Sequence, residues 1–382
     1  MLLLQALGSN GSGQLGLGHT DDVSTPQPVL LPPDFFTIPA RNSSGPSEGQ
    51  DQSKLLGIAA GGNHTLLLFS SGTILWSGDP TTGACGRAEP PPPTSAVASG
   101  SSPPVPRFRP VDLSPLLEDE RRNISLVTAT WEASIIATSD KLYSFGSGTK
   151  GELGLGAGTT RAAEPTLIPN FPPVGTKVVH LAACMGHVVV VLSNGEAWGW
   201  GNGRKGQLGE PAAGAVSSPR RIEGVDFKAV RAVCGREFTC LFGAPETGEV
   251  LVLGSDKWGV KSQAPKRVNG WKEVGAGWGS VYVLKKDGTL FSWGRNDHGQ
   301  MAPEGIGRVR TIAVGSEHAM ALTDAGDLMA WGWGEHGNCG PICANSGQKG
   351  TQNKIASVGP EAKIVTIGAG CATSWIALEK AP

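Results

Sequence analysis

Hydrophobic residues along the chain gather in short runs, and turn sequences separate the runs. The runs are a few residues long, and a period of two among their hydrophobic residues is typical of strands with one face packed against a core. Asn194-Gly195 and Asp287-Gly288 each follow such a run. These pairs favour tight two-residue hairpins. The pattern therefore predicts an all-β chain of short antiparallel strands.

The first of two repeated signatures is a large hydrophobic residue, usually aromatic, followed by glycine and a glycine-rich turn. The copy at Trp200-Gly201 continues into Gly206-Gln207-Leu208-Gly209, and the copy at Trp76-Ser77-Gly78 is degenerate. The copies begin at Leu7, Trp76, Phe145, Trp200, Leu253, Trp293 and Trp331.

The second signature is a small residue or glycine, two spacers, and then histidine or a substitute that leads into a hydrophobic run. Its clear copies end at His64, His187 and His318. Weaker copies are Trp131–Ser134, Gly235–Phe238, Gly277–Ser280 and the segment Gly370–Ser374. The two signatures alternate in step, so the chain is an internal repeat of seven units.

A small sheet of this kind cannot bury both faces alone, and stacking the units radially buries them. The fold expected for residues 1–382 is therefore a single seven-bladed β-propeller. The last unit, 364–378, lacks a closing strand, and the first glycine loop lacks strands before it. We expect Leu2–Leu7 to pair with the C-terminal strands, which would close the ring and remove exposed sheet edges.

Two stretches interrupt the repeat, and their composition is typical of flexible loop insertions. Residues 38–53 are rich in Ser, Gly and Pro, and residues 79–123 include Pro90–Pro93 and a serine-rich tract. Neither composition can bury a core. The charged run 118–122 within the second stretch is expected to be a solvated face.

The composition narrows the classes of function. The 56 glycines and 28 prolines fit turn-rich β structure better than helices, and the net charge is −1. A protein that binds nucleic acid by neutralising phosphates usually has a basic excess, so no direct nucleic-acid contact is expected. The start of the chain does not resemble a signal peptide, and no apolar stretch is long enough to span a membrane. Seven scattered cysteines fit reduced thiols in a cytoplasmic or nuclear protein.

No residue set points to catalysis, a metal or a cofactor. Three stretches match the Gly-x-Gly-x-x-Gly pattern, but they occupy one repeat position and no helical pattern follows them, so they are expected to be tight loops. The histidines at 64, 187 and 318 also share one repeat position, which favours a structural hydrogen bond. Cys339 and Cys343 lack a second ligand pair. We therefore expect a protein that is not an enzyme.

The alternating signatures resemble the repeat of the regulator-of-chromosome-condensation family over nearly the whole chain. Within that family, Trp331–Pro341 and Gly370–Trp375 are similar to a fungal branch, the killer-toxin-insensitivity proteins. The resemblance implies a heterodimer with a small CSL-type zinc-ribbon protein that carries iron or zinc on four cysteines and passes electrons. It also implies roles in Elongator-dependent modification of the tRNA wobble uridine and in diphthamide biosynthesis.

The partner-binding site is predicted from loop residues on one face of the ring. Exposed tryptophan beside charged side chains is the usual composition of a binding hot spot. Trp131 and Trp278 precede hydrophobic runs and would supply contact area, and the Glu and His side chains would bond the partner's metal-loop backbone. The predicted residues are Trp278, Trp131, His318, Glu317, Glu335, His336 and Asn338. The alternative function is that of a guanine-nucleotide exchange factor for a small GTPase, or of a chromatin-associated propeller.

Overall fold

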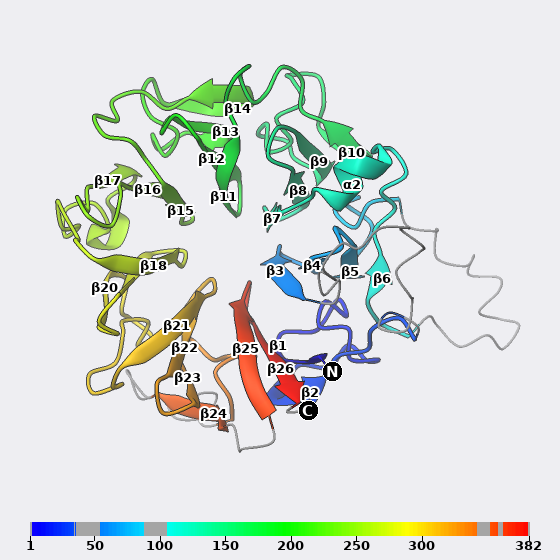
Figure 1. The fold of residues 1–382 in the computed structure, drawn as a ribbon, viewed down its shortest axis with the longest axis vertical. Helices are drawn as coiled ribbons and strands as arrows, with labels where there is room; N and C mark the ends of the chain where they lie inside the picture. The colour runs from blue at the N-terminus through cyan, green and yellow to red at the C-terminus, as the bar shows by residue number, and fades with distance from the viewer. Residues whose placement is uncertain are drawn as a thin grey trace, which may run out of the picture.

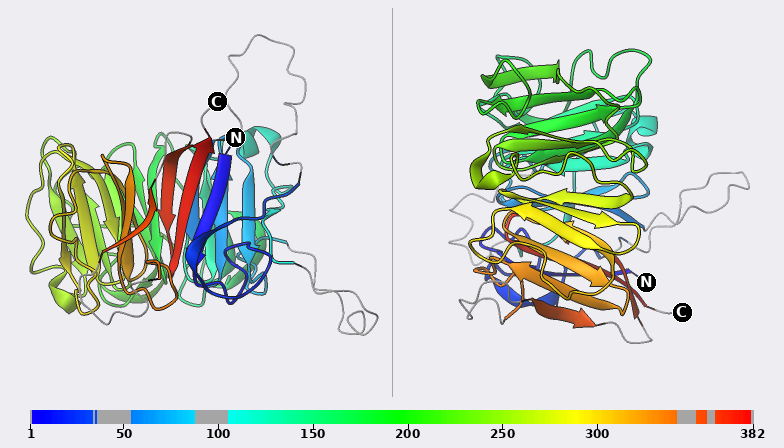
Figure 2. Two further views of the ribbon diagram at one scale, coloured as in Figure 1. Left: turned by 90° about the horizontal axis from the view of Figure 1, so that it is seen from below. Right: turned by 90° about the vertical axis from the view of Figure 1, so that its left-hand side faces the viewer.

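Seven small antiparallel sheets surround a central axis, so the predicted all-β seven-bladed propeller is confirmed (Figure 1). The computed structural model describes residues 2–33, 35, 54–87, 105–341, 352–357 and 362–380. Seen from the side, the sheets stand next to one another around the ring (Figure 2). No helix in these ranges is long and apolar enough to cross a membrane.

The first three blades have four strands each. From the axis outward they are β3 (Leu55–Ala60), β4 (His64–Phe69), β5 (Ile74–Gly78) and β6 (Arg109–Pro110); β7 (Leu126–Ala129), β8 (Ala133–Ala137), β9 (Leu142–Ser147) and β10 (Arg161–Leu167); and β11 (Val178–Cys184), β12 (His187–Leu192), β13 (Ala197–Gly203) and β14 (Ala213–Arg221).

Blades 4 and 5 have three strands and blades 6 and 7 have four. They are β15 (Arg231–Cys234), β16 (Phe238–Phe242) and β17 (Val250–Gly254); β18 (Trp271–Ala276), β19 (Ser280–Lys285) and β20 (Leu290–Gly294); β21 (Val309–Val314), β22 (His318–Thr323), β23 (Asp327–Gly332) and β24 (Asn353–Ser357); and β25 (Ala362–Ala369), β26 (Thr373–Lys380), β1 (Leu2–Gly8) and β2 (Val23–Pro28).

The two ends of the chain meet in blade 7, as the sequence predicted. β1 lies between β2 and β26, and its register with β26 runs from Leu2 opposite Glu379 to Gly8 opposite Thr373. Backbone hydrogen bonds between the two ends therefore close the ring, and neither terminal strand is left as an open edge.

The strand registers correct two repeat assignments. Gly78 pairs with His64 as Gly201 pairs with His187, so Ser77 and not Trp76 occupies the position of the repeat tryptophan. The Ser77 hydroxyl donates to the carbonyl of Gly13 in the preceding glycine loop, 2.6 Å away. The Trp200 indole makes the same kind of bond to Glu152. A hydroxyl thus replaces the indole N–H as the donor.

The second correction concerns the weak copy of the histidine signature in blade 2. Ala133 pairs with Gly146, so Ala133 and not Ser134 corresponds to His64. Ser134 is the next residue of the strand, and its hydroxyl lies 3.0 Å from Nε2 of His64 in the neighbouring blade. The Ala-Ser pair was placed one residue out of register because alanine has no distinguishing side chain.

The segment 79–123 is packed at both ends, where a flexible loop was predicted. Cys85 and Phe108 are fully buried, and Leu116 is 2% exposed. The charged run 118–122 forms α2 (Glu118–Arg122), which has no buried residue, as expected for a solvated face. Residues 88–104 of this segment and all of the predicted loop 38–53 lie outside the described residues.

Candidate functional site

One face of the propeller carries the seven turns that join the first and second strands of each blade, together with the glycine loops; it is called here the inner-turn face. Backbone hydrogen bonds tie these turns to one another. The Trp131 N–H donates to Met185, and the Trp278 N–H donates to Ser316, at 2.8 and 2.6 Å. Arg236 in turn donates to the Trp278 carbonyl at 3.0 Å. The turns that carry the two tryptophans are therefore held at fixed positions near the axis.

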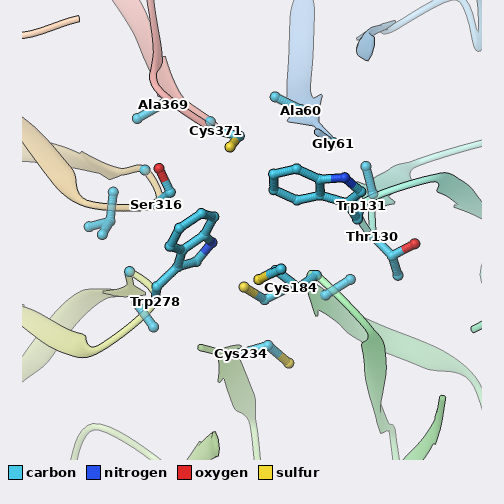
Figure 3. A pocket seen from close by; sticks show the side chains of 18 residues that line it. Ala60, Gly61, Thr130, Trp131, Cys184, Cys234, Trp278, Ser316, Ala369 and Cys371 are labelled. Atoms are coloured by element: carbon cyan, nitrogen blue, oxygen red, sulfur yellow. The ribbon is translucent and has the colours of Figure 1, made fainter. Parts of the chain in front are cut away.

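Trp131 and Trp278 lie together at the axis, at a small cavity of about 120 Å³ (Figure 3). Their ring centroids are 6.0 Å apart, although the residues come from blades 2 and 5. Around the same cavity, small residues such as Ala60 and Ala369 end the inner strands. The small side chains leave room for the two indoles, and Trp131 remains 36% exposed to solvent.

Three cysteine side chains, Cys184, Cys234 and Cys371, line the same cavity (Figure 3). Burial raises the pKa of Cys184 to about 12 and also raises the pKa of Cys371. A thiol is nucleophilic and binds metals as its thiolate, which burial disfavours here. Within the described ranges, no cluster of three or more His, Cys, Asp or Glu side chains is arranged to hold a metal ion.

A larger groove of about 380 Å³ continues outward from Trp278. Trp258 and Trp333, 42% and 37% exposed, form its walls together with Trp278. The guanidinium of Arg295 lies between the two outer indoles, 4.9 Å from the ring centroid of Trp258 and 5.9 Å from that of Trp333. Cation–π contacts of this kind fix both partners relative to each other.

Arg295 is held in place by two carboxylates. Its guanidinium forms a two-pronged ion pair with Asp297, at 2.6 and 2.8 Å, and also pairs with Glu317. Hydrogen bonding to Arg295 lowers the pKa of Asp297 well below its usual value. Burial raises the pKa of Glu317. Hydrogen bonds from the Gln300 amide and from Arg295 to the carboxylate act in the opposite direction. The groove therefore has a rigid, charged floor beneath exposed aromatic rings.

Further stacking extends the aromatic surface. The imidazole of His298 lies flat on Trp333, with ring centroids 4.2 Å apart and an angle of 9° between the planes. Arg236 lies 5.5 Å from the ring centroid of Trp278, and Lys257 lies 5.3 Å from that of Trp258. The inner-turn face thus presents a connected strip of four tryptophans interleaved with cations, which we call the indole strip (Trp131, Trp278, Trp258 and Trp333).

The structure brings some of the predicted site residues together and removes others from the surface. Trp131 and Trp278 lie side by side, while Glu317 lines the groove but is 7% exposed and paired with Arg295. Glu335 and His336 are exposed farther out on the same face, where His336 Nδ1 lies 2.7 Å from Asp22 Oδ2.

His318 and Asn338 are corrected from partner contacts to buried structural groups, because each is 1% exposed. His318 Nε2 lies 2.9 Å from the Ser374 hydroxyl, and the Asn338 amide donates to the Trp333 carbonyl at 3.1 Å. Both side chains are used within the propeller, so neither can reach a partner. The expectation that repeat-position histidines make structural bonds therefore applies to His318 as well.

The sequence prediction missed Trp258, Trp333, Arg295 and Arg236. Trp258 stands outside the repeat position, and Trp333 lies two residues after the repeat tryptophan, so both were visible as extra indoles. Nothing in the linear order indicates that Arg295 lies between them, because the three residues come from different glycine loops. Only the ring arrangement brings these loops together.

Comparisons with known proteins agree with the fold. A family profile described as the RCC1-like domain matches residues 4–376. An RCC1 repeat-containing protein of Schizosaccharomyces pombe is 28% identical over 83% of each chain. The secretion-regulating guanine nucleotide exchange factor of mouse is 27% identical, over 78% of this chain and 61% of its own.

Solved structures show the same architecture. Prp20p of Saccharomyces cerevisiae superposes with a TM-score of 0.78 at 20% identity, covering 100% of this chain and 92% of its own. Human WBSCR16 superposes with a TM-score of 0.75 at 17% identity, covering 100% and 99%. At these identities the likeness concerns the fold alone. Together with the repeat signatures and the closed ring of seven blades, the family match shows that the chain belongs to the RCC1-like domain family.

Proposed function

We propose that this propeller is a non-enzymatic scaffold or regulatory subunit that binds a partner protein on its inner-turn face through the indole strip. The observation that carries the proposal is the exposure of Trp131, Trp258 and Trp333, which are 36%, 42% and 37% exposed around a groove with a rigid floor. Tryptophan and arginine in a preorganised pocket are the usual centres of protein interfaces. Such rings lose little conformational freedom on binding, because their neighbours already hold them.

The partner that we propose is a small CSL-type zinc-ribbon protein. The support is the similarity of Trp331–Pro341 and Gly370–Trp375 to the fungal killer-toxin-insensitivity protein thirteen. By the same similarity, the heterodimer would act in the cytoplasm and nucleus, in Elongator-dependent modification of the tRNA wobble uridine and in diphthamide biosynthesis. Cys371 and Trp333 within these segments line the axial cavity and the groove, so the similar residues adjoin the indole strip.

The test is a binding titration of the full chain with the purified zinc-ribbon protein from the same organism. Trp278→Ala is expected to weaken the affinity by about thirtyfold, the effect of removing a hot-spot residue worth about 2 kcal/mol. Val174→Ala is the matched control, because Val174 is fully exposed and lies in the connection between blades 2 and 3, away from the inner-turn face. An unchanged affinity of the Trp278 variant would remove this side chain from the interface.

The second candidate function is guanine-nucleotide exchange on a small GTPase. The observation that favours it is the similarity to the mouse secretion-regulating guanine nucleotide exchange factor. A nucleotide-release assay with a panel of small GTPases separates the two functions. The scaffold should leave the release rate unchanged, whereas an exchange factor should accelerate it.

A further inference from the structure

Blade 5 ends at its third strand, β20, although five other blades continue to a fourth. Blade 4 also has three strands, but the chain that follows covers its edge. There the Val250 N–H donates to Lys266 and the Val268 N–H donates to Gly248, at 3.2 and 2.7 Å, and Glu249 bridges Arg267. In blade 5 the Val309 N–H likewise donates to the Gly288 carbonyl at the hairpin turn, at 2.9 Å, but in the part of the chain that the structure describes no bond like that from Val250 to Lys266 covers the strand β20 itself.

The outer edge of β20 presents free backbone groups. The Lys285 N–H donates to the Thr289 carbonyl, so the alternation of a strand turns the N–H and C=O groups of Leu290 and Ser292 away from β19. In blade 3 the corresponding residue is Ala197, and its carbonyl accepts from Ile222 at 2.8 Å. Across the described ranges, no backbone group bonds to the outward side of Leu290 or Ser292.

The returning chain, residues 301–308, runs past this edge without pairing with it. Pro303 has no N–H, and Gly305 and Gly307 have φ values of 75° and 80°, outside the strand region. Its bonds to β20 involve the Ser292 side chain: the Ala302 N–H donates to the Ser292 hydroxyl at 2.7 Å, and this hydroxyl donates to the Met301 sulfur at 3.4 Å. The sequence of this segment therefore explains why it does not act as the fourth strand.

A slot of about 560 Å³ separates β20 from the returning chain. Leu290 and Phe291 line one side, and Met301, Pro303 and Ile306 line the other. The volume lies within the roughly 300–1,000 Å³ of typical ligand pockets. The slot thus combines two things that a bound strand needs: unpaired backbone groups at strand spacing and an apolar wall for alternate side chains.

We propose that this slot binds an extended peptide segment of a partner protein, which pairs with β20 as the missing fourth strand of blade 5. The segment runs antiparallel to β20, as β10 and β14 run against their neighbours. It carries apolar side chains at alternate positions and no proline where its backbone faces Leu290. Addition of a strand to an open sheet edge is an established mode of peptide recognition. The site lies on the flank of the ring and is independent of the indole strip.

The test begins with a phage-displayed library of random seven-residue peptides, panned against the full chain. The expected result is enrichment of peptides with alternating hydrophobic residues. Hydrogen exchange, followed by NMR, then determines how a synthetic peptide from this set pairs with β20. The amides of Leu290 and Ser292 should exchange rapidly in the free protein and become protected on binding, while those of Phe291 and Trp293 are protected throughout.

Two variants at one position separate backbone pairing from side-chain contact. Leu290→Pro removes the outward N–H at a sheet edge, where proline is tolerated. It should weaken peptide binding by about tenfold. Leu290→Ala also loses contacts of the side chain with the peptide but keeps the N–H, so it should weaken binding by less than the tenfold expected for proline. A peptide N-methylated at the residue that faces Leu290 repeats the test without altering the protein.

The proposal is overturned if Leu290 and Ser292 are already protected in the free chain, since residues 301–308 would then occupy the edge. It is also overturned if no enriched peptide protects these two amides, or if proline and alanine at position 290 weaken binding equally. None of these outcomes depends on the zinc-ribbon partner, so the scaffold proposal stands or falls separately.

Discussion

At the scale of single residues, three contacts between neighbouring blades share one kind of histidine–hydroxyl hydrogen bond. His64, His187 and His318 each reach a hydroxyl of the next blade, at 3.0, 3.0 and 2.9 Å. The Ser374 hydroxyl donates its hydrogen to the Asn338 carbonyl at 2.8 Å, so it must accept from the Nε2–H of His318. The neutral imidazole with its hydrogen on Nε2 satisfies this chain of hydrogen bonds, which anchors a glycine loop to the following blade.

The glycine of the histidine signature follows from the same packing. A Cβ atom on Gly315 would lie 2.3 Å from the imidazole carbon Cε1 of His318, closer than any real contact. The absence of a side chain three residues before His318 therefore leaves the space in which its ring lies. The signature read from the sequence is a packing unit rather than a chemical site.

Protonation of these histidines should destabilise the fold. Burial lowers the pKa of His64, His187 and His318 to about 4 in each case, below the unfolded value of 6.5. Between these values the unfolded chain binds more protons than the folded chain does. The free energy of unfolding is therefore highest above about pH 6.5 and falls as the pH approaches 4. Thermal unfolding measured from pH 7.5 to 4.5 should show a midpoint that decreases through this window.

The variant His318→Ala tests the assignment to one of these contacts. Loss of the bond leaves the Ser374 hydroxyl short of a donor and opens a cavity, at a cost of about 2 kcal/mol near pH 7. The fall in stability with acid should become shallower than in the unaltered protein, because one buried histidine is gone. His19→Ala is the control, since His19 is exposed and should change neither quantity. Equal acid dependence in the His318 variant would contradict the linkage.

Arg295 should matter to binding through the positions of Trp258 and Trp333. Lysine keeps the charge but cannot pair with Asp297 at two points while also reaching Glu317. Arg295→Lys is therefore expected to weaken binding of the zinc-ribbon partner by about three- to tenfold, or about 1 kcal/mol. Arg204→Lys, an exposed position in another glycine loop, is the control in the same titration. If both variants bind equally, the floor of the groove does not organise the strip.

At the scale of elements, the inner three strands of each blade could be predicted and the fourth could not. The inner strands carry hydrophobic runs and signature residues, and their number and order follow from the repeat. Fourth strands such as β14 and β2 are half exposed and contain proline and serine, so their sequences resemble loops. The short strand β6 pairs with β5 directly after Phe108, which is buried and packs against Trp375, far away in the chain. That contact has no local signal.

The glycine of the Trp-Gly pair is needed for its backbone conformation, and this can be tested at Gly201. Gly201 has a φ of 99°, and a Cβ atom there would lie 2.4 Å from the Gly186 carbonyl oxygen. Gly201→Ala should therefore lower the free energy of unfolding by on the order of 2–3 kcal/mol through strain and clash. Gly186→Ala is the matched control, because its nearest neighbour would be 3.4 Å away. Chemical denaturation of the two variants measures the difference, and equal stabilities would refute the role given to Gly201.

At the scale of the whole molecule, the ring assembles the site and explains why the sequence indicated only part of it. Trp333, from a glycine loop of blade 6, lines the groove together with Trp278. Trp131 and Trp278 belong to blades 2 and 5, and they meet because their inner turns point to the same axis. Repeat position predicted which face they share. Whether a given side chain is exposed depends on the neighbouring blade, so His318 and Asn338 were assigned to the surface although other residues bury them.

Ring closure can be tested by moving the ends of the chain. Leu2 and Glu379 are register partners, so a short linker can join the termini and new ends can be opened elsewhere. New ends between Asn194 and Gly195 divide blade 3 within a hairpin, and the two parts still pair through the ladder of β12 and β13. New ends after Gly224 divide the chain between blades, where side-chain packing alone would then close the ring.

The permutant opened at Asn194-Gly195 should unfold at a midpoint close to that of the unaltered protein, since hydrogen-bonded strands again join its first and last segments. The permutant opened after Gly224 should unfold at a lower midpoint, because separation of blades 3 and 4 breaks no strand ladder. Zinc-ribbon binding checks that both forms keep the inner-turn face. If the second permutant is as stable as the first, packing between blades is sufficient to close the ring, and the strand exchange in blade 7 contributes little to stability.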